Sequence, residues 1–198
     1  MELTRLFTIY IHLIACCVAI GLVLTSDIAM VKHLLQGDSA APADPEHLES
    51  LQKTVTYALA ALWVTGVGII DIDVSTKGWE YFANPKIQAK IGLVLLLTLN
   101  GVVLHKTVLP LIQKAGSLLK MTFSQRLLAL FAGSVSGVTW LYAAFIGVGR
   151  QLAWKYSLVE LLAAYPVLIL GGFCSMLALT AWADFQANER APARYLSI

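Results

Sequence analysis

Long apolar runs separated by short polar segments dominate this sequence. Each of five runs is long enough to cross a bilayer, because about 20 residues rising 1.5 Å each span its roughly 30 Å hydrocarbon core. The predicted spans are residues 6–33, 54–71, 87–109, 127–149 and 158–183. The pattern therefore predicts an all-α fold: a single polytopic integral membrane domain over residues 1–198, built as a five-transmembrane-helix bundle.

Proline and polar residues predict where these helices stop or bend. Pro110 is expected to end or kink the third span, because proline lacks the backbone N–H and restricts the residue before it. Pro166 is expected to kink the first half of the fifth span. The polar, proline-containing segment 36–50 is expected to form a solvated loop or a short interfacial segment, and the polar tail 184–198 is expected to fray.

Composition supports a membrane protein and excludes one class of partner. The 198 residues are 58% hydrophobic and only 13% charged, whereas soluble proteins average about 25% charged residues. The net charge of +2 and the absence of a basic run argue against nucleic acid. Five spans put the two termini on opposite sides of the membrane. Lys and Arg are more numerous on the side that holds the C-terminus, which predicts an N-out, C-in protein of the bacterial inner membrane.

Three histidines inside the spans are the main candidates for chemistry, since ionisable groups in a membrane are costly and usually face a bundle interior or a site. His12 and His33 share one face of the first helix but lie about 31 Å apart along it. His105 lies near the end of the third span, and Lys90 is about 60° from its face.

These positions suggest a haem site. His33 and His105 are expected at similar depth, and two imidazoles from neighbouring helices commonly hold a b-type haem in a helical bundle. His12 is a candidate single ligand of the same haem or of another one. The alternative is that each histidine is satisfied structurally by a neighbouring helix or by lipid headgroups.

Charged side chains add candidates of lower specificity. Lys90 is expected to pair with a haem propionate or an anionic substrate. Asp27, inside the first span, is a candidate for a salt bridge or a proton relay. Asp71 and Asp73, at the end of the second span, are expected to be hydrated, with cation binding or proton transfer as the alternative.

The positions His12, Gly21, His33, Gly78-Trp79 and Lys90 resemble the motifs of HemJ-type protoporphyrinogen oxidases and CopD-like haem-binding membrane proteins, over the first half of the chain. Two features depart from the family pattern: Asp27 and Ile28 stand where an arginine precedes the second histidine, and the histidine expected soon after the lysine is replaced around Asn100. The resemblance therefore implies a haem-binding bundle that handles electrons rather than a particular oxidation.

The sequence thus predicts an integral membrane protein that binds haem b and acts in electron transfer or a haem-linked oxidation, with a redox partner or a quinone. Its enzyme status stays open, with a membrane oxidoreductase as the candidate. The alternative is a non-enzymatic assembly subunit or small carrier with structural histidines, which packs through Gly133-xxx-Gly137 and Gly171-Gly172 as a homo-oligomer or in a membrane complex.

Overall fold

The computed structural model describes residues 2–36 and 45–195, which form helices joined by short turns and contain no strand. Within these ranges, five helical segments are long and apolar enough to cross a membrane. They are α1 (Glu2–Gln36), α2 (Pro45–Lys77), α3 (Pro85–Val103) with its continuation α4 (Leu109–Ala115), α5 (Phe123–Val148), and α6 (Leu158–Leu162) with α7 (Ala164–Tyr195). The predicted all-α bundle of a multi-pass membrane protein is confirmed.

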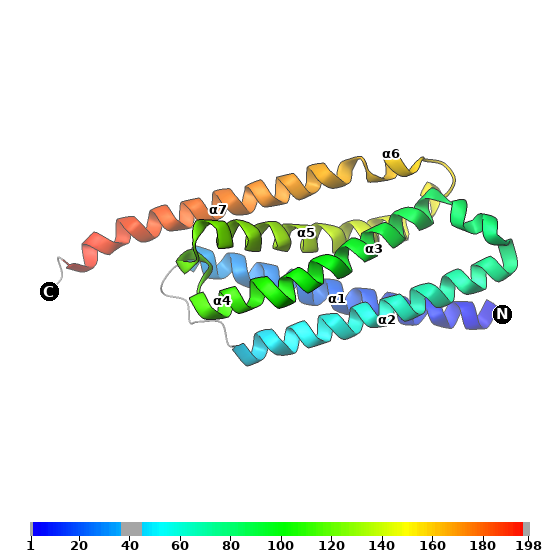
Figure 1. The fold of residues 1–198 in the computed structure, drawn as a ribbon, viewed down its shortest axis with the longest axis horizontal. Coiled ribbons are helices and arrows are strands. Elements are labelled where there is room, and N and C mark those ends of the chain that lie inside the picture. The colour runs from blue at the N-terminus through cyan, green and yellow to red at the C-terminus, as the bar shows by residue number, and fades with distance from the viewer. Residues whose placement is uncertain (1, 37–44, 196–198) are drawn as a thin grey trace.

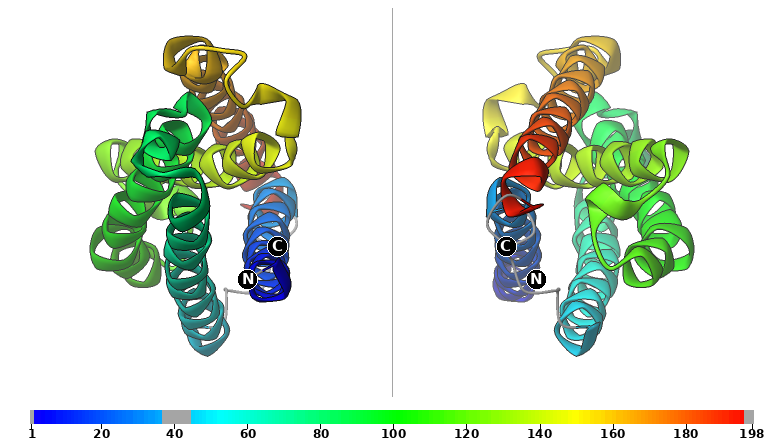
Figure 2. Two further views of the ribbon diagram at one scale, coloured as in Figure 1. Left: turned by 90° about the vertical axis from the view of Figure 1, so that its right-hand side faces the viewer. Right: turned by 90° about the vertical axis from the view of Figure 1, so that its left-hand side faces the viewer.

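Helix α5 is the centre of the bundle. It packs against α1, α3 and α7, while α1 makes its most extensive contact with α2. Of the residues in the most apolar stretch of α5, 39% are buried, whereas the corresponding share is 22% or less in each of the other four spans. α1 begins and α7 ends at opposite ends of the bundle (Figure 1), and the end views show the α1–α2 pair beneath the remaining helices (Figure 2).

Buried apolar side chains form separate clusters along this bundle. One contains Leu34 at the end of α1, Val108 and Leu130. Another contains Ala19 of α1 and Trp140 of α5. The outward faces carry many large exposed apolar side chains, as expected where lipid rather than water surrounds the protein.

Proline acts differently at two positions. The break between α6 and α7 at Ala163 confirms the predicted kink, because Pro166 cannot donate a hydrogen bond to the preceding turn. Of the stop or kink predicted at Pro110, the stop is wrong. The helix widens into a π-helix, η3 (Leu104–Val108), and continues through Pro110 as α4. A wider turn accommodates a proline that would otherwise clash with the carbonyl four residues earlier.

The ends of the helices also differ from the prediction. α2 already begins at Pro45, so the acidic part of the predicted loop is helical, while residues 37–44 lie outside the described residues. α7 continues to Tyr195 rather than fraying. Between α2 and α3, Gly78 adopts a φ of 78°, which favours glycine, and leads into the 3₁₀ helix η2 (Trp79–Ala83).

Candidate functional site

His12 is held between α1 and α2 by a hydrogen bond that fixes its protonation pattern. Its Nδ1 lies 2.8 Å from the Thr65 hydroxyl oxygen. That hydroxyl donates its single hydrogen to the Ala61 carbonyl at 2.6 Å, so Nδ1 is the donor to Thr65. The lone pair of the neutral ring is then on Nε2. A second-shell bond of this kind orients a histidine for ligation through its other nitrogen.

Lys90 of α3 brings a cation to the same place. It lies close enough to interact electrostatically with His12 and with Cys16, one turn further along α1. Its side chain is largely buried, yet within the described part of the chain it forms no hydrogen bond or ion pair. Of the four predicted site residues, His12 and Lys90 thus lie close to each other. The sequence instead predicts Lys90 near the face of His105.

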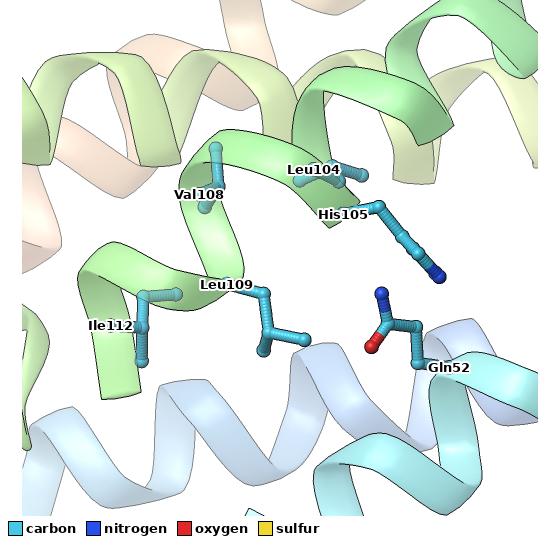
Figure 3. Close-up of a pocket in the computed structure, with 6 residues that line it drawn as sticks. All are labelled: Gln52, Leu104, His105, Val108, Leu109 and Ile112. Carbon is cyan, nitrogen blue, oxygen red and sulfur yellow. The ribbon is translucent and has the colours of Figure 1, made fainter. Parts of the chain in front are cut away.

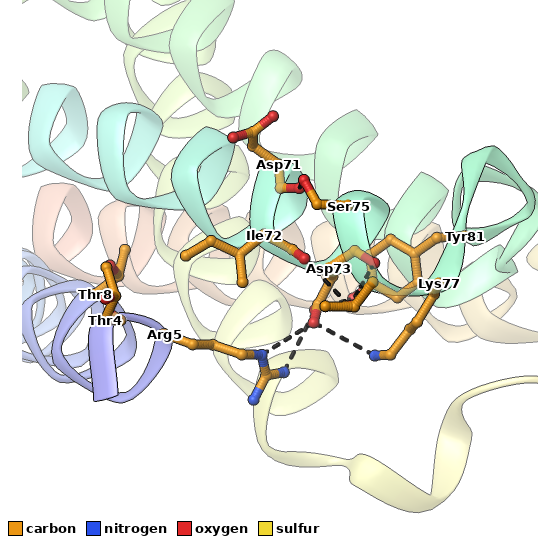
Figure 4. Close-up of polar contacts among 10 residues, drawn as sticks. Thr4, Arg5, Thr8, Asp71, Ile72, Asp73, Ser75, Lys77 and Tyr81 are labelled. Carbon is orange, nitrogen blue, oxygen red and sulfur yellow. Dashed lines mark hydrogen bonds and ion pairs between the residues drawn. The ribbon is translucent and has the colours of Figure 1, made fainter. Parts of the chain in front are cut away.

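A group of charged residues closes the end of the bundle next to this site (Figure 4). Asp73 is 2% exposed and accepts hydrogen bonds from Arg5 at 2.9 and 3.3 Å, from Tyr81 at 2.8 Å and from Lys77 at 3.4 Å. Burial, together with the bond to Asp73, raises the pKa of Tyr81 to about 12. The expected hydration of this carboxylate is wrong; it holds only for Asp71, which is exposed.

His105 lies at the opposite end of the bundle from Lys90, about 22 Å away along the same helix. It is exposed and sits in the π-helix η3. Its ring and the Gln52 amide of α2 point toward one another across a pocket of about 150 Å³ (Figure 3). The other lining residues are apolar: Leu104, Val108, Leu109 and Ile112.

His33 is half-buried in the last turn of α1. Its neighbour Leu34 packs in the same core cluster as Val108 and Leu104, which flank His105. His33 and His105 therefore lie at the same end of the bundle, away from His12. The candidates divide into His12 with Lys90 at one end and His33 with His105 at the other.

Among the described residues, Asp27 has no salt bridge, hydrogen bond or other charged partner. Its Oδ2 lies against Gly137 of α5, 3.1 Å from where a Cβ would stand. Gly172 of α7 is likewise covered by Val138 and Ser134, so both glycines pack inside the bundle, whereas Gly133 and Gly171 face open space.

Sequence reasoning missed two partners. Thr65 carried no signal, because a threonine in a span ordinarily bonds its own helix backbone. Tyr81 lies in a short aromatic segment, which does not by itself indicate a hydrogen bond to Asp73. Across the residues that the structure describes, no group of three or more His, Cys, Asp or Glu side chains is placed to hold a metal ion, so a metal here would depend on one or two histidines.

No family model matches this chain, and neither the curated proteins nor the solved structures include one with significant similarity to it.

Proposed function

We propose that this chain is a haem b-binding protein of the bacterial inner membrane, with the N-terminus outside, acting in electron transfer or a haem-linked oxidation. The observation that supports it most is the His12–Thr65 hydrogen bond, which leaves a lone pair on Nε2. Haem iron in proteins takes such a neutral imidazole nitrogen. His12 would hold the haem iron, and Thr65 orients its ring.

Lys90 supplies the second element of the proposal. The Lys90 ammonium forms no hydrogen bond within the described residues and is influenced by Asp73 only through space, so a negative charge in direct contact would stabilise it. A haem propionate or an anionic substrate provides that charge. When bound, haem supplies one-electron chemistry; the chain contributes the ligand, the counter-charge and the apolar surroundings of the neighbouring Ala15, Ala19 and Leu62.

The other end of the bundle offers a second set of ligands. His33 and His105 share that end, and His105 is set in a π-helix, an irregularity frequent at functional sites. A bis-histidine haem there is the competing arrangement within the same proposal. A haem held at either end would exchange electrons with a redox partner or with a quinone in the bilayer.

Single alanine variants of the three histidines test the proposal. Protein produced with ample haem is purified, and its Soret band and haem-to-protein ratio are measured. We expect His12→Ala to lose haem while His33→Ala and His105→Ala retain it. If haem is lost only in His33→Ala and His105→Ala, the haem site lies at the other end of the bundle. Wild-type protein without a Soret band contradicts haem binding.

Two threonine substitutions on α2 form a matched pair. Thr65→Val removes the acceptor that fixes the His12 ring, and loss of such a second-shell partner weakens ligation by about 10–100-fold. Thr54→Val removes a hydroxyl that bonds only the Ser50 carbonyl and should leave haem affinity unchanged. Equal effects of the two would favour the alternative, an assembly subunit or carrier in which the histidines are structural.

A further inference from the structure

The carboxyl group of Asp27 is placed within the bundle rather than at its surface. Its Oδ2 contacts Gly137, which is near the midpoint of α5, the helix running from Phe123 to Val148. A helix of this length extends about 39 Å and exceeds the roughly 30 Å hydrocarbon core at both ends. A side chain against its middle therefore lies in the hydrocarbon layer.

Charged groups are missing around this carboxyl. α5 has no charged residue between Arg126 and Arg150, and α7 has none before Asp184; their titratable side chains in between are Tyr142, Tyr165 and Cys174.

Helices α1 and α2 are antiparallel, because His12 pairs with Thr65 and Arg5 pairs with Asp73. In this register, the turn of α2 that contains Glu49 and Lys53 lies at the level of Asp27. These two residues form an exposed ion pair with each other. Among the side chains that the structure describes, no neighbouring helix therefore compensates a negative charge on Asp27.

A second polar group in the same packing layer also lacks a partner. The hydroxyl oxygen of Ser134, one turn from Gly137 on α5, is fully buried and has no hydrogen bond among the described residues. It faces Gly172 of α7. Asp27 of α1 and Ser134 thus lie at adjacent turns of α5, and neither has a hydrogen-bonding partner among the described residues. For Ser134 this is unusual, because nearly all buried polar atoms in proteins are satisfied.

We propose that Asp27 is a proton-binding site within the membrane, which holds a carboxylic acid at neutral pH and releases its proton when the bundle admits a base or water. An unpaired carboxylate in hydrocarbon costs several kcal/mol, whereas the protonated group is neutral and both donates and accepts a hydrogen bond. A metal cation is the weaker ligand, since it needs more oxygen ligands than one carboxylate and one hydroxyl provide. This proposal does not depend on haem.

Dicyclohexylcarbodiimide tests the proposal, because it reacts in the apolar phase with protonated carboxyl groups. The acid adds across one C=N bond: its proton goes to nitrogen, its oxygen bonds the central carbon, and an acyl shift gives a stable N-acylurea. The modified residue is located by peptide mass spectrometry in the full-length protein in liposomes. We expect the adduct on Asp27, with each pH unit above its pKa lowering the labelling rate about tenfold.

Control variants and a cation series complete the design. Asp27→Asn should remove the adduct, whereas Asp71→Asn, which alters an exposed carboxyl two turns before η2, should not change it. Infrared spectra should show the carboxylic acid C=O band in wild type and lose it in Asp27→Asn. An unlabelled Asp27, or a C=O band unchanged by the substitution, overturns the proposal. Protection by sodium at constant pH and ionic strength overturns it in favour of a cation site.

Discussion

Asp73 and Asp27 are two carboxyl groups of the same bundle with opposite surroundings. Asp73 is 2% exposed and accepts hydrogen bonds from Arg5, Lys77 and Tyr81. Asp27 is more exposed than Asp73 but has no partner in the part of the chain that the structure describes. The more deeply buried group is thus the compensated one.

The difference shows that the burial of a carboxyl group and the compensation of its negative charge by hydrogen-bond donors and cations are separate properties. A carboxylate held by three donors is fixed in one charge state and joins α1 to α2. A carboxyl held by none can change its charge state without breaking a bond. Asp73 is therefore suited to stability and Asp27 to proton exchange, and the variants below test this division.

The largest effect is expected from Asp73→Asn. Removing the charge leaves Arg5 and Lys77 without their anion, and breaking such a pair costs about 2–4 kcal/mol once the partial exposure of the cations is considered. Denaturant unfolding in micelles, followed by circular dichroism, measures the loss. The matched variant Asp71→Asn, at an exposed neighbour, should stay within about 0.5 kcal/mol, and equal losses would contradict the assignment.

Tyr81→Phe removes one donor to Asp73 and should cost about 1–1.5 kcal/mol. It also has a pH signature. Because the pKa of Tyr81 is raised to about 12 from an unfolded value near 10, its contribution is complete below pH 10 and is lost as the pH rises through 12. In ultraviolet titration, Tyr81→Phe should lose one late-titrating phenol relative to the wild type. Tyr57→Phe, at an exposed tyrosine, should leave that late component in place.

Gly137→Ala tests the contact of α5 with Asp27. The added methyl would stand 3.1 Å from Oδ2, so the side chain must shift, at a cost of about 1 kcal/mol. Gly133→Ala, one turn earlier, meets open space and should be neutral or stabilising. Thermal unfolding of the two variants in the same micelles gives the comparison; equal midpoints would show that Asp27 does not press on α5.

Asp27→Asn should change stability least, by less than about 0.5 kcal/mol at neutral pH, because the neutral acid and the amide have similar size and no partner is lost. Unfolding measured from mildly acidic to alkaline pH supplies the check. A loss as large as that of Asp73→Asn would mean that Asp27 is ionised and held by a bound cation.

The spans were predictable because hydropathy alone determines which segments can cross a bilayer. Their ends were not, since the acids after Pro45 and the proline at position 110 are tolerated inside helices that continue through them. Local propensity disfavours both, but packing against neighbouring helices outweighs it.

The site was predictable only in part. A histidine within a span marked His12, yet its partner depends on the register of α1 against α2, which no local pattern encodes. The same register determines that Asp73 rather than Asp71 bonds Arg5 of α1. The two aspartates are two positions apart and therefore lie on opposite faces of α2. The haem, the electron partner and the N-out orientation stay predictions.

One ion pair joins α1 to α2 and another joins α5 to α7. The positions of these residues in the chain determine which pair can form first during synthesis. Arg5 and Asp73 are 68 positions apart at the start of the chain, so a ribosome adding roughly 5–20 residues per second delivers the second partner about 3–14 s after the first. Arg126 and Asp184 join α5 to α7 and can meet only after α7 has been made. The α1–α2 hairpin can thus close before α5 and α7 are synthesised, whereas α7 pairs with a helix that was made before it.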